Sequence, residues 1–363
     1  MARRLESDKL LFVSVVVLVL FGTLMVFSAS AVMASQLYGN SYYFLFRQLA
    51  WVGAGLVLMV GMMNLDYRRL ASPRLIFPAL GLQLVFLVAV LFRSPSHHAH
   101  RWFHIWAAGF QPSELSKIVL VIFLAYFLDL RKGAVNDWKH TLVPIGLVAG
   151  SSVALILKEP DFGTALAIGV VFAAMLFAAG LHWGYFAAGA AALAPLVGLL
   201  ILLTPYRTKR LEAFLDPWKD PLGKGFQIIQ SYIAVGTGGI DGLGLMEGKQ
   251  KLFFLPEPHT DFIFAVIGEE LGFIGALFVL ALFGVILWRG LRAAAVCPNE
   301  LGRLLAIGLT VLVVGQALVN ISVVLGLLPT KGIALPLVSY GGSSLLANLA
   351  AVGILLNISQ HAS

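Results

Sequence analysis

The sequence contains little charge and a single cysteine. Asp, Glu, Lys and Arg make up only 12% of its 363 residues, whereas a soluble domain usually carries about 25%. Cys297 has no second cysteine to pair with, which excludes an internal disulfide framework and a cysteine-based metal site. Hydrophobic residues make up 59% of the chain, and the mean hydropathy is +0.90. We therefore predict an integral membrane protein.

The chain also lacks a stripe of Lys and Arg with interleaved aromatic residues. Its formal net charge is +7, but the basic residues lie in short clusters between apolar runs. That distribution is typical of the charges that set topology in a membrane protein. We therefore expect no nucleic-acid partner.

Ten apolar runs are separated by polar breaks. The first is long enough to cross a hydrocarbon core of about 30 Å, and more runs follow it, so we interpret it as a retained helix and not as a removed signal peptide. The predicted fold is all-α: a polytopic membrane protein with about ten transmembrane helices in a single domain over residues 1–363. The runs fall at about 10–34, 44–63, 74–92, 112–130, 141–158, 162–180, 184–203, 262–288, 303–327 and 341–358.

Basic residues are concentrated in alternate connections between these runs. The opposite short connections hold only Arg93, Arg101, Lys158 and Lys331. Since cytoplasmic loops carry the excess of Lys and Arg, both termini are predicted to be cytoplasmic. The long polar segment 204–261, between the seventh and eighth helices, is then predicted to be a large extracytoplasmic loop. The four basic groups are Arg3, Arg4 and Lys9; Arg68, Arg69 and Arg74; Arg131, Lys132 and Lys139; and Arg289, Arg292 and Arg303.

Charged residues at the edges of apolar runs are costly and indicate functional positions. Glu114 and Lys117 are three residues apart at the start of the fourth run, so they share a helix face and can pair. The pair is either a structural ion pair or one that faces a substrate. The charged turn 158–161 is either a wetted connection or part of a cleft that holds a polar ligand.

The third charged position is Asp261, directly before the eighth run. Asp261 could cap that helix, and at helical spacing it falls near one face with Ala265, Gly268, Gly272 and Gly275. Small residues on such a face let a neighbouring helix approach closely. A carboxylate beside Glu257 and His259 has the chemistry of a general base or of a cation ligand. The histidines between His97 and His104 match no standard metal spacing, so we interpret them as part of an outer loop.

Several of these segments, in their order and spacing, resemble the SEDS family (shape, elongation, division and sporulation; FtsW, RodA and SpoVE type). The Thr-Lys-Gly sequence at 330–332 favours the division type, FtsW, over RodA. The segments that carry the resemblance are Arg101-Trp102, Gln111–Lys117, Glu159–Thr164, Tyr206-Arg207, Asp216–Pro221, Gln227–Ser231, Gln250–Asp261, Gly268–Gly272, Leu328–Gly332 and Pro336–Ser344.

The resemblance implies a peptidoglycan glycosyltransferase that polymerises lipid II, the lipid-linked disaccharide–pentapeptide, on the outer face of the bacterial cytoplasmic membrane. It further implies a divalent cation (Mg or Mn), a class B penicillin-binding protein as transpeptidase partner, and regulators of the divisome or elongasome. Such a reaction is inverting. It requires a carboxylate near the attacking hydroxyl and positive charge at the leaving diphosphate.

Individual residues match the family's functional positions. Asp261 matches the essential aspartate, which implies a general base or a cation ligand. The resemblance implies that Arg101, Lys117, Lys331 and, more weakly, Arg207 bind the diphosphate. Glu114 and Asp161 would orient those cations or hold the metal, and Glu257 matches a family position without an assigned role.

Two other functions compete with this one. A flippase or other transporter of lipid-linked precursors would also need many helices with buried charges. Its key charges should lie near the bilayer midplane, often in repeated halves, whereas here they map to the outer edge and no repeat is evident. A non-catalytic scaffold would not require these charged residues.

Overall fold

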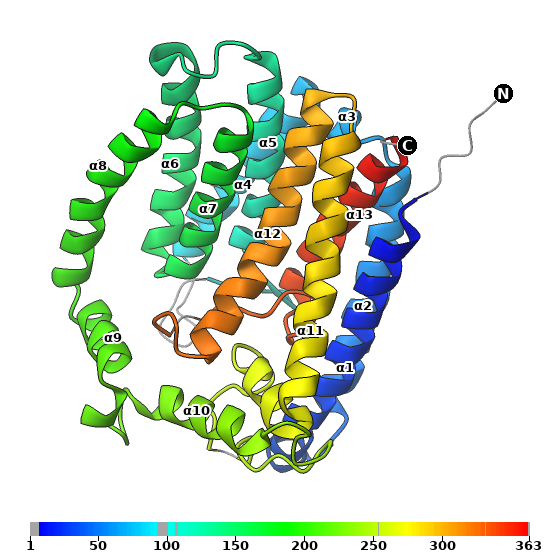
Figure 1. Cartoon of the computed structure of the whole chain (residues 1–363), viewed down its shortest axis with the longest axis vertical. Helices are drawn as coiled ribbons and strands as arrows, with labels where there is room; N and C mark the ends of the chain where they lie inside the picture. Colours follow the sequence, from blue (N-terminus) through cyan, green and yellow to red (C-terminus); the bar gives the residue numbers. More distant parts are fainter. Residues whose placement is uncertain (1–6, 93–100, 106–107, 253, 331, 362–363) are drawn as a thin grey trace.

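The chain folds into a bundle of long helices. The computed structural model describes residues 7–92, 101–105, 108–252, 254–330 and 332–361 (Figure 1). Its α-helices are α1 (Lys9–Tyr38), α2 (Tyr43–Asn64), α3 (Tyr67–Leu70), α4 (Pro73–Leu91), α5 (Pro112–Leu130), α6 (Val143–Lys158), α7 (Phe162–Ala178), α8 (Trp183–Leu202), α9 (Pro205–Leu215), α10 (Phe226–Gly238), α11 (Ile263–Val296), α12 (Glu300–Val324) and α13 (Gly342–His361). A π-helical turn, Trp138–Leu142, leads into α6, and a short 3-10 helix covers Pro217–Lys219.

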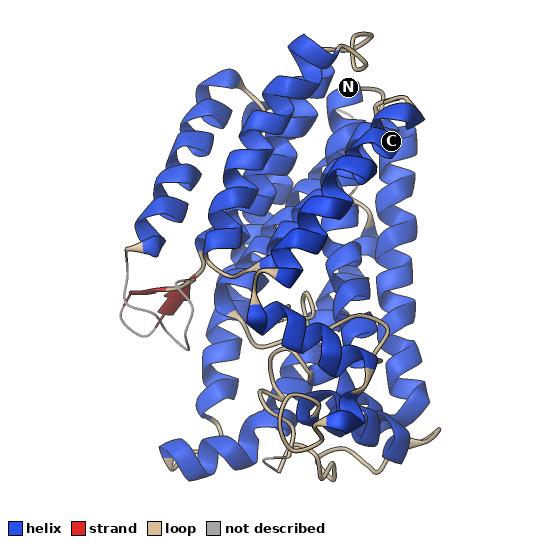
Figure 2. Cartoon of the chain, turned by 90° about the vertical axis from the view of Figure 1, so that its left-hand side faces the viewer, coloured by secondary structure: helices blue, strands red, loops and turns tan. Residues whose placement is uncertain are grey.

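The all-α class is confirmed for the described residues, apart from one small ribbon. Strands β1 (Phe103–Ile105) and β2 (Ala108–Phe110) pair antiparallel, with His104 opposite Gly109. The ribbon lies between α4 and α5 in the sequence (Figure 2). Its residues are too few to form a hydrophobic layer of their own.

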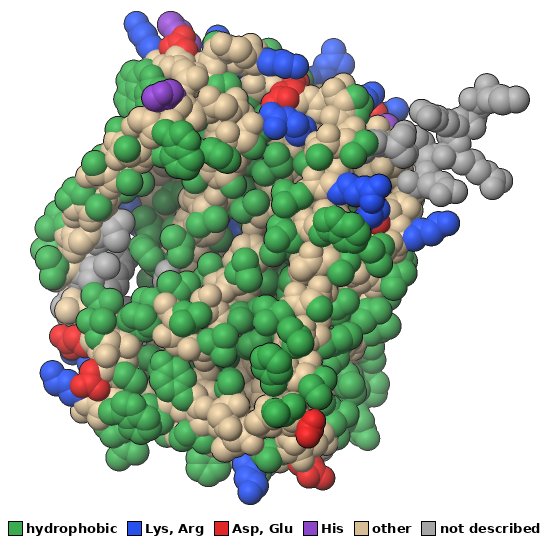
Figure 3. Space-filling view, viewed as in Figure 1, with side chains coloured by type: hydrophobic (Ala, Val, Ile, Leu, Met, Phe, Trp, Pro, Cys, Tyr) green, Lys and Arg blue, Asp and Glu red, His purple; other side chains and the backbone are tan. Residues whose placement is uncertain are grey.

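Each of the ten predicted runs falls on one of the long helices. By length and composition, seven described segments could cross a membrane: α1, α2, α4, Trp138–Lys158, α11, α12 and α13. The apolar helix α7 is shorter, with 17 residues. These segments show a multi-pass membrane protein, and their outward faces carry exposed apolar side chains (Figure 3).

Helices α12 and α13 form the interior of the bundle. Within their apolar windows 72% and 78% of the residues are buried, against at most 50% in the other five segments. Helix α13 packs on α2 and also contacts α5, while α12 packs on α5, α7 and α11. The two central helices are thus shielded from lipid, and they can carry the polar side chains that line a cavity.

The sequence predicted segment 204–261 as a loop, but the segment is partly helical. It contains α9, the 3-10 helix and α10, and it lies at the end of the bundle opposite the start of α1 and the end of α13 (Figure 1). Its last part folds back onto α11 through buried carboxylates. Glu269 accepts hydrogen bonds from the Lys249 and Gln250 amides at 2.8 and 3.1 Å.

A second anchor of this segment is an ion pair in the core. Lys251 Nζ lies 2.6 Å from Glu270 Oε1, and the two side chains are 3% and 0% exposed. Ser28 Oγ on α1 donates to the same carboxylate, and the Met246 amide donates to it at 3.0 Å. The segment that leads to Asp261 is therefore fixed to both α1 and α11.

The predicted small-residue face of the eighth helix is only partly correct. Helix α11 begins at Ile263 after Phe262, so Asp261 precedes the helix and does not cap it. Gly272 has φ 62° and interrupts the helical geometry, because the 240–242 backbone lies against it. The close approach itself is confirmed: a Cβ on Gly238 would lie 1.9 Å from the Gly268 carbonyl oxygen.

We predict that Gly238→Ala destabilises the protein while Gly236→Ala does not. Both glycines lie in α10, but a Cβ at Gly236 meets nothing within 4 Å. Overpacking at Gly238 should cost about 1–3 kcal/mol or more, whereas alanine at Gly236 should add up to about 1 kcal/mol through helix propensity. Thermal unfolding in detergent, followed by tryptophan fluorescence, measures the difference. Equal midpoints for the two variants would contradict the proposed backbone contact.

Candidate active site

A polar cavity of about 400 Å³ lies between α5, α7, α12 and the segments that precede α11 and α13. Five of the residues predicted from the sequence line it: Arg101, Glu114, Asp161, Glu257 and Asp261. They come from four separate regions of the chain, and the fold brings them to one place. The other lining residues are Trp102, Gln111, Gly163, Thr164, Ala167, Thr260, Gln316, Gly332, Ile333, Ala334, Tyr340, Gly341 and Ser344.

The backbone at Asp261 is held firmly. Asn320 Nδ2 donates to the Asp261 carbonyl oxygen at 2.8 Å and to the Ile333 carbonyl oxygen at 2.6 Å. Ser339 Oγ donates to the carbonyl oxygen of the preceding residue, Thr260, at 2.5 Å. These bonds fix the position of Asp261 relative to the 330–341 segment.

The Asp261 carboxylate, in contrast, has no hydrogen bond or ion pair within the part of the chain that the structure describes. It is partly buried and faces the cavity, close to Gly332, where a Cβ would lie 3.0 Å from Oδ2. A carboxylate held on a rigid backbone without a structural partner is available to a ligand. This arrangement suits a general base or a cation ligand.

The surroundings raise the pKa of Asp261 to about 7. Burial is the main cause, and the nearby Glu257 and Asp161 carboxylates add to it, while Arg101 and Arg210 oppose it. A base with a pKa near the working pH can both accept and release a proton readily.

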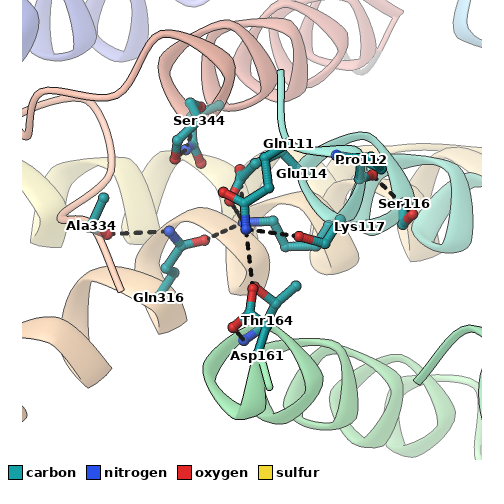
Figure 4. Close-up of polar contacts among 12 residues, drawn as sticks. Gln111, Pro112, Glu114, Ser116, Lys117, Asp161, Thr164, Gln316, Ala334 and Ser344 are labelled. Carbon is teal, nitrogen blue, oxygen red and sulfur yellow. Dashed lines mark hydrogen bonds and ion pairs between the residues drawn. The ribbon is translucent and has the colours of Figure 1, made fainter. Parts of the chain in front are cut away.

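Asp161 and Gln111 join the start of α7 to the start of α5 (Figure 4). The Asp161 carboxylate accepts from the Thr164 amide at 3.1 Å and from Thr164 Oγ1 at 2.8 Å, which caps α7. Gln111 Nε2 donates to the same carboxylate at 3.1 Å. Asp161 therefore lines the cavity and also holds two of its walls together.

The charged turn at 158–161 is exposed at Lys158 and buried at Glu159 and Asp161. Glu159 is completely buried, and burial together with the charge of Asp161 raises the pKa of its carboxyl to about 8. Its carbonyl oxygen accepts from Arg101 Nε at 2.9 Å, and the Pro160 carbonyl oxygen accepts from Arg101 Nη2. The turn holds the Arg101 guanidinium at the cavity, which Asp161 of the same turn also lines.

Glu114 and Lys117 form the predicted ion pair, deep in the protein. Lys117 Nζ lies 2.9 Å from Glu114 Oε2, and the two side chains are 3% and 8% exposed. Lys117 also donates to Gln316 Oε1 at 2.7 Å (Figure 4). Glu114 and Gln316 line the cavity, whereas Lys117 lies behind them. The pair therefore joins α5 to Gln316 on α12, and it presents its acidic member to the cavity.

Two of the predicted cationic side chains lie outside what the structure describes. Lys331 lies outside the described residues. Arg207 belongs to α9, but its side chain is likewise outside what the structure describes. The same holds for His97, His98 and His100 and for the side chain of His104.

Three polar residues of the site were not found by sequence reasoning. Gln316 and Asn320 lie one turn apart on α12, inside an apolar helix, and both bind backbone carbonyls of the 333–334 segment. Amides inside a membrane helix are a recognisable signal because burying them is costly. Arg210, one turn after Arg207, donates to the Thr330 carbonyl oxygen at 3.0 Å.

The described residues contain no cluster of three or more His, Cys, Asp or Glu side chains that could hold a metal ion by itself. Mg²⁺ is often bound by only one or two carboxylates together with phosphate oxygens of a substrate. The unpartnered Asp261 carboxylate fits such a shared site.

These features define a class: a multi-pass α-helical membrane protein with a charged cavity beside a structured, polar segment. A family model described as "Cell cycle protein", covering the FtsW, RodA and SpoVE type, matches residues 8–363. The chain belongs to this family.

Similar proteins cover nearly the whole chain. A probable peptidoglycan glycosyltransferase FtsW of Geobacter metallireducens is 44% identical over 98% of this chain and 95% of its own. Stage V sporulation protein E of Bacillus subtilis is 41% identical over 99% and 98%. The sequence-based resemblance to this family is thereby confirmed.

Two solved structures share the fold. A chain from a peptidoglycan synthase complex, studied for the structural coordination of polymerization and crosslinking, is 35% identical with a TM-score of 0.81 and covers 98% of both chains. The rod shape determining protein RodA of Thermus thermophilus is 31% identical with a TM-score of 0.72, over 98% of this chain and 97% of its own.

Proposed function

We propose that this protein is a peptidoglycan glycosyltransferase that polymerises lipid II into glycan strands, in cell division. The observation that carries the proposal is the Asp261 carboxylate, which lies in a charged cavity on a fixed backbone and has no partner among the described residues. The names of the relatives support the same activity.

In this reaction a sugar hydroxyl of one lipid II molecule attacks the anomeric carbon of another. As the new C–O bond forms, the Asp261 carboxylate takes the hydroxyl proton. The bond from the anomeric carbon to the diphosphate breaks, the diphosphate leaves with the electron pair, and the configuration inverts. Arg101, which the 159–160 carbonyl groups hold at the cavity, offsets the charge that develops on the leaving group.

A divalent cation would be held by Asp261 together with the substrate diphosphate, with Glu257 near enough to add negative charge. When bound, such a cation would help to neutralise the leaving diphosphate. Glu114 and Asp161 would contribute by positioning their neighbours: Glu114 binds Lys117, and Asp161 binds Gln111. Lys331 and Arg207 remain proposed contacts of the diphosphate.

The proposed setting is the bacterial cytoplasmic membrane. All ten predicted runs would cross it, both termini would lie in the cytoplasm, and the segment 204–261 would face outward with the cavity beside it. The synthase complex among the similar structures supports a class B penicillin-binding protein as the transpeptidase partner, within a division or elongation complex.

The test is polymerisation by purified protein. The protein, with its partner transpeptidase, is incubated with fluorescent lipid II and Mg²⁺ or Mn²⁺, and the products are resolved on a gel. We expect a ladder of glycan strands. In parallel, the protein is placed in vesicles and movement of the precursor between leaflets is measured. Movement without polymer would overturn the proposal in favour of the flippase alternative.

The pH dependence of the rate tests Asp261 as the base. With Asp261 acting as the base and no cation on its carboxylate, the rate should rise roughly tenfold per pH unit up to about pH 7 and then level off, because the ionised carboxylate is the active form. A cation bound to the carboxylate would move this midpoint to lower pH. Glu257→Gln removes a negative charge that raises the pKa of Asp261, so the midpoint should move to lower pH.

The matched control is Glu247→Gln. Glu247 is an exposed acid in the same outer segment and is not among the charges that act on Asp261, so its removal should leave the midpoint unchanged. If Glu257→Gln leaves the midpoint of the pH–rate profile unchanged, or if the rate does not depend on pH, Asp261 is not the titrating base.

A further inference from the structure

Tyr340, shortly before α13, presents an aromatic ring to the active-site cavity. Among the described residues that line the cavity, only Trp102 is also aromatic. Two buried rings enclose Tyr340 from behind: the centroid of His259 lies 5.6 Å away, and that of Phe44 on α2 lies 5.2 Å away in an edge-on arrangement. The cavity therefore has a fixed apolar surface among its charged side chains.

The hydroxyl of Tyr340 is held from α2. Burial raises the pKa of this hydroxyl, and a hydrogen bond from the Arg47 guanidinium opposes the rise. Arg47 is itself fixed, because its guanidinium carbon lies 4.6 Å from the centre of the Tyr43 ring, in a cation–π contact. Tyr43 in turn stacks on Tyr38 at the end of α1, with ring centroids 4.0 Å apart. The hydroxyl is thus engaged on the α2 side, and the ring is what Tyr340 offers to the cavity.

The backbone ties this ring to the Asp261 segment. The Tyr340 amide donates to the His259 carbonyl oxygen at 2.9 Å. The preceding residue, Ser339, donates from Oγ to the Thr260 carbonyl oxygen at 2.5 Å. Because two successive residues of one segment bind two successive residues of the other, the ring and the Asp261 carboxylate keep a fixed relative position.

The chemistry of the ring selects one part of the substrate. A sugar ring has hydroxyl groups at its rim and apolar C–H groups on its faces, so a face can pack on an aromatic ring while the rim stays in reach of polar groups. A diphosphate gains nothing from the same surface, because the face of an aromatic ring carries negative charge density. Arg101 is the one cationic side chain among the described lining residues, and the 159–160 turn holds it.

We propose that the Tyr340 ring is the surface on which the sugar that carries the attacking hydroxyl rests, and that Arg47 is the positioning residue that holds this ring. The inference rests on the proposed function. The sugar must place its hydroxyl at the Asp261 carboxylate for that carboxylate to take the proton. Contact with a ring tied to the same segment restrains the sugar there without a further buried charge.

The experiment compares KM for lipid II with the inhibition constant of a polyprenyl diphosphate, which has the chain and the diphosphate but no sugar. Tyr340→Leu removes the ring, so we expect it to raise KM for lipid II about tenfold. The inhibition constant of the polyprenyl diphosphate should stay as in wild type. Tyr42→Leu makes the same change at an exposed tyrosine outside the cavity lining, at the start of α2, and should alter neither constant.

A double-mutant cycle tests Arg47. Arg47→Met and Tyr340→Phe each remove the hydrogen bond but keep the ring, so each should raise KM only about threefold. If Arg47 acts through the Tyr340 hydroxyl, the double variant should be no worse than either single variant. Effects that multiply in the double variant would overturn Arg47 as the positioning residue.

The possible outcomes separate this inference from the proposed function. Equal increases in KM and in the inhibition constant for Tyr340→Leu, or no change in KM, would overturn Tyr340 as the sugar contact, while polymer formation by wild type would still uphold the proposed function. A wild-type protein that makes no polymer refutes the proposed function and this inference with it. If Tyr340→Leu does not fold, Arg47→Met must still raise KM and leave the inhibition constant unchanged; a wild-type KM in that variant would overturn the proposal.

Discussion

Asp261→Asn is expected to reduce polymerisation by a factor of about 10²–10⁴, the usual contribution of a general base. The substitution keeps the size of the side chain and removes the negative charge. Folding should be unaffected, because the bonds that hold this position go from Asn320 and Ser339 to backbone carbonyls. The carboxylate itself has no partner among the described residues that the change would break. The rate of glycan formation from lipid II, with the unfolding temperature as a second readout, measures both effects.

The control for this prediction is Asp241→Asn. Asp241 is an exposed acid of the same outer segment and does not line the cavity, so the variant should keep its activity. A cation titration then separates the two proposed roles of Asp261. If it is the base, added Mg²⁺ does not restore Asp261→Asn; if it is mainly a cation ligand, high Mg²⁺ restores part of the rate. Wild-type activity in Asp261→Asn at ordinary Mg²⁺ would exclude both roles.

Much of the helical framework could be predicted from the sequence, because a segment in a bilayer must satisfy its backbone hydrogen bonds internally and be apolar enough to face lipid. Both conditions leave a local signal, and every predicted run lies on a helix. The interruption at Gly272 and the helices of segment 204–261 left a weaker signal. They depend on packing between α10, the 240–242 backbone and α11, which no single window of the sequence reveals.

The site was partly predictable for a similar reason. Charges at the edges of apolar runs are costly wherever they lie, so Glu114, Asp161 and Asp261 could be selected one by one. Their meeting in one cavity depends on tertiary packing. The bond from Gln111 to Asp161 and the clamp that Asn320 forms between Asp261 and Ile333 are also tertiary. Local spacing showed that Glu114 and Lys117 can pair, but it could not show that Lys117 lies behind Gln316 and outside the cavity lining.

Lys117→Met is expected to destabilise the protein by about 3–5 kcal/mol, since removing one partner of a buried ion pair leaves an uncompensated charge. Both side chains are less than a tenth exposed. The change also removes the hydrogen bond from Lys117 to Gln316 on α12, so the contact between α5 and α12 should weaken. The free energy of unfolding in detergent, from denaturant titration, measures the loss. Lys132→Met, at an exposed lysine beyond the end of α5, is the control and should be neutral.

The double variant Glu114→Gln/Lys117→Met separates the structural role of the pair from its role in the cavity. Replacing both members of a buried pair by neutral groups is often nearly neutral for stability, so most of the lost stability should return. Polymerisation should not return, because Glu114 lines the cavity and the double variant still lacks its carboxylate there. A stable double variant with wild-type activity would show that the pair serves folding alone. Wild-type stability of Lys117→Met by itself would mean that the Glu114 charge is compensated by another group.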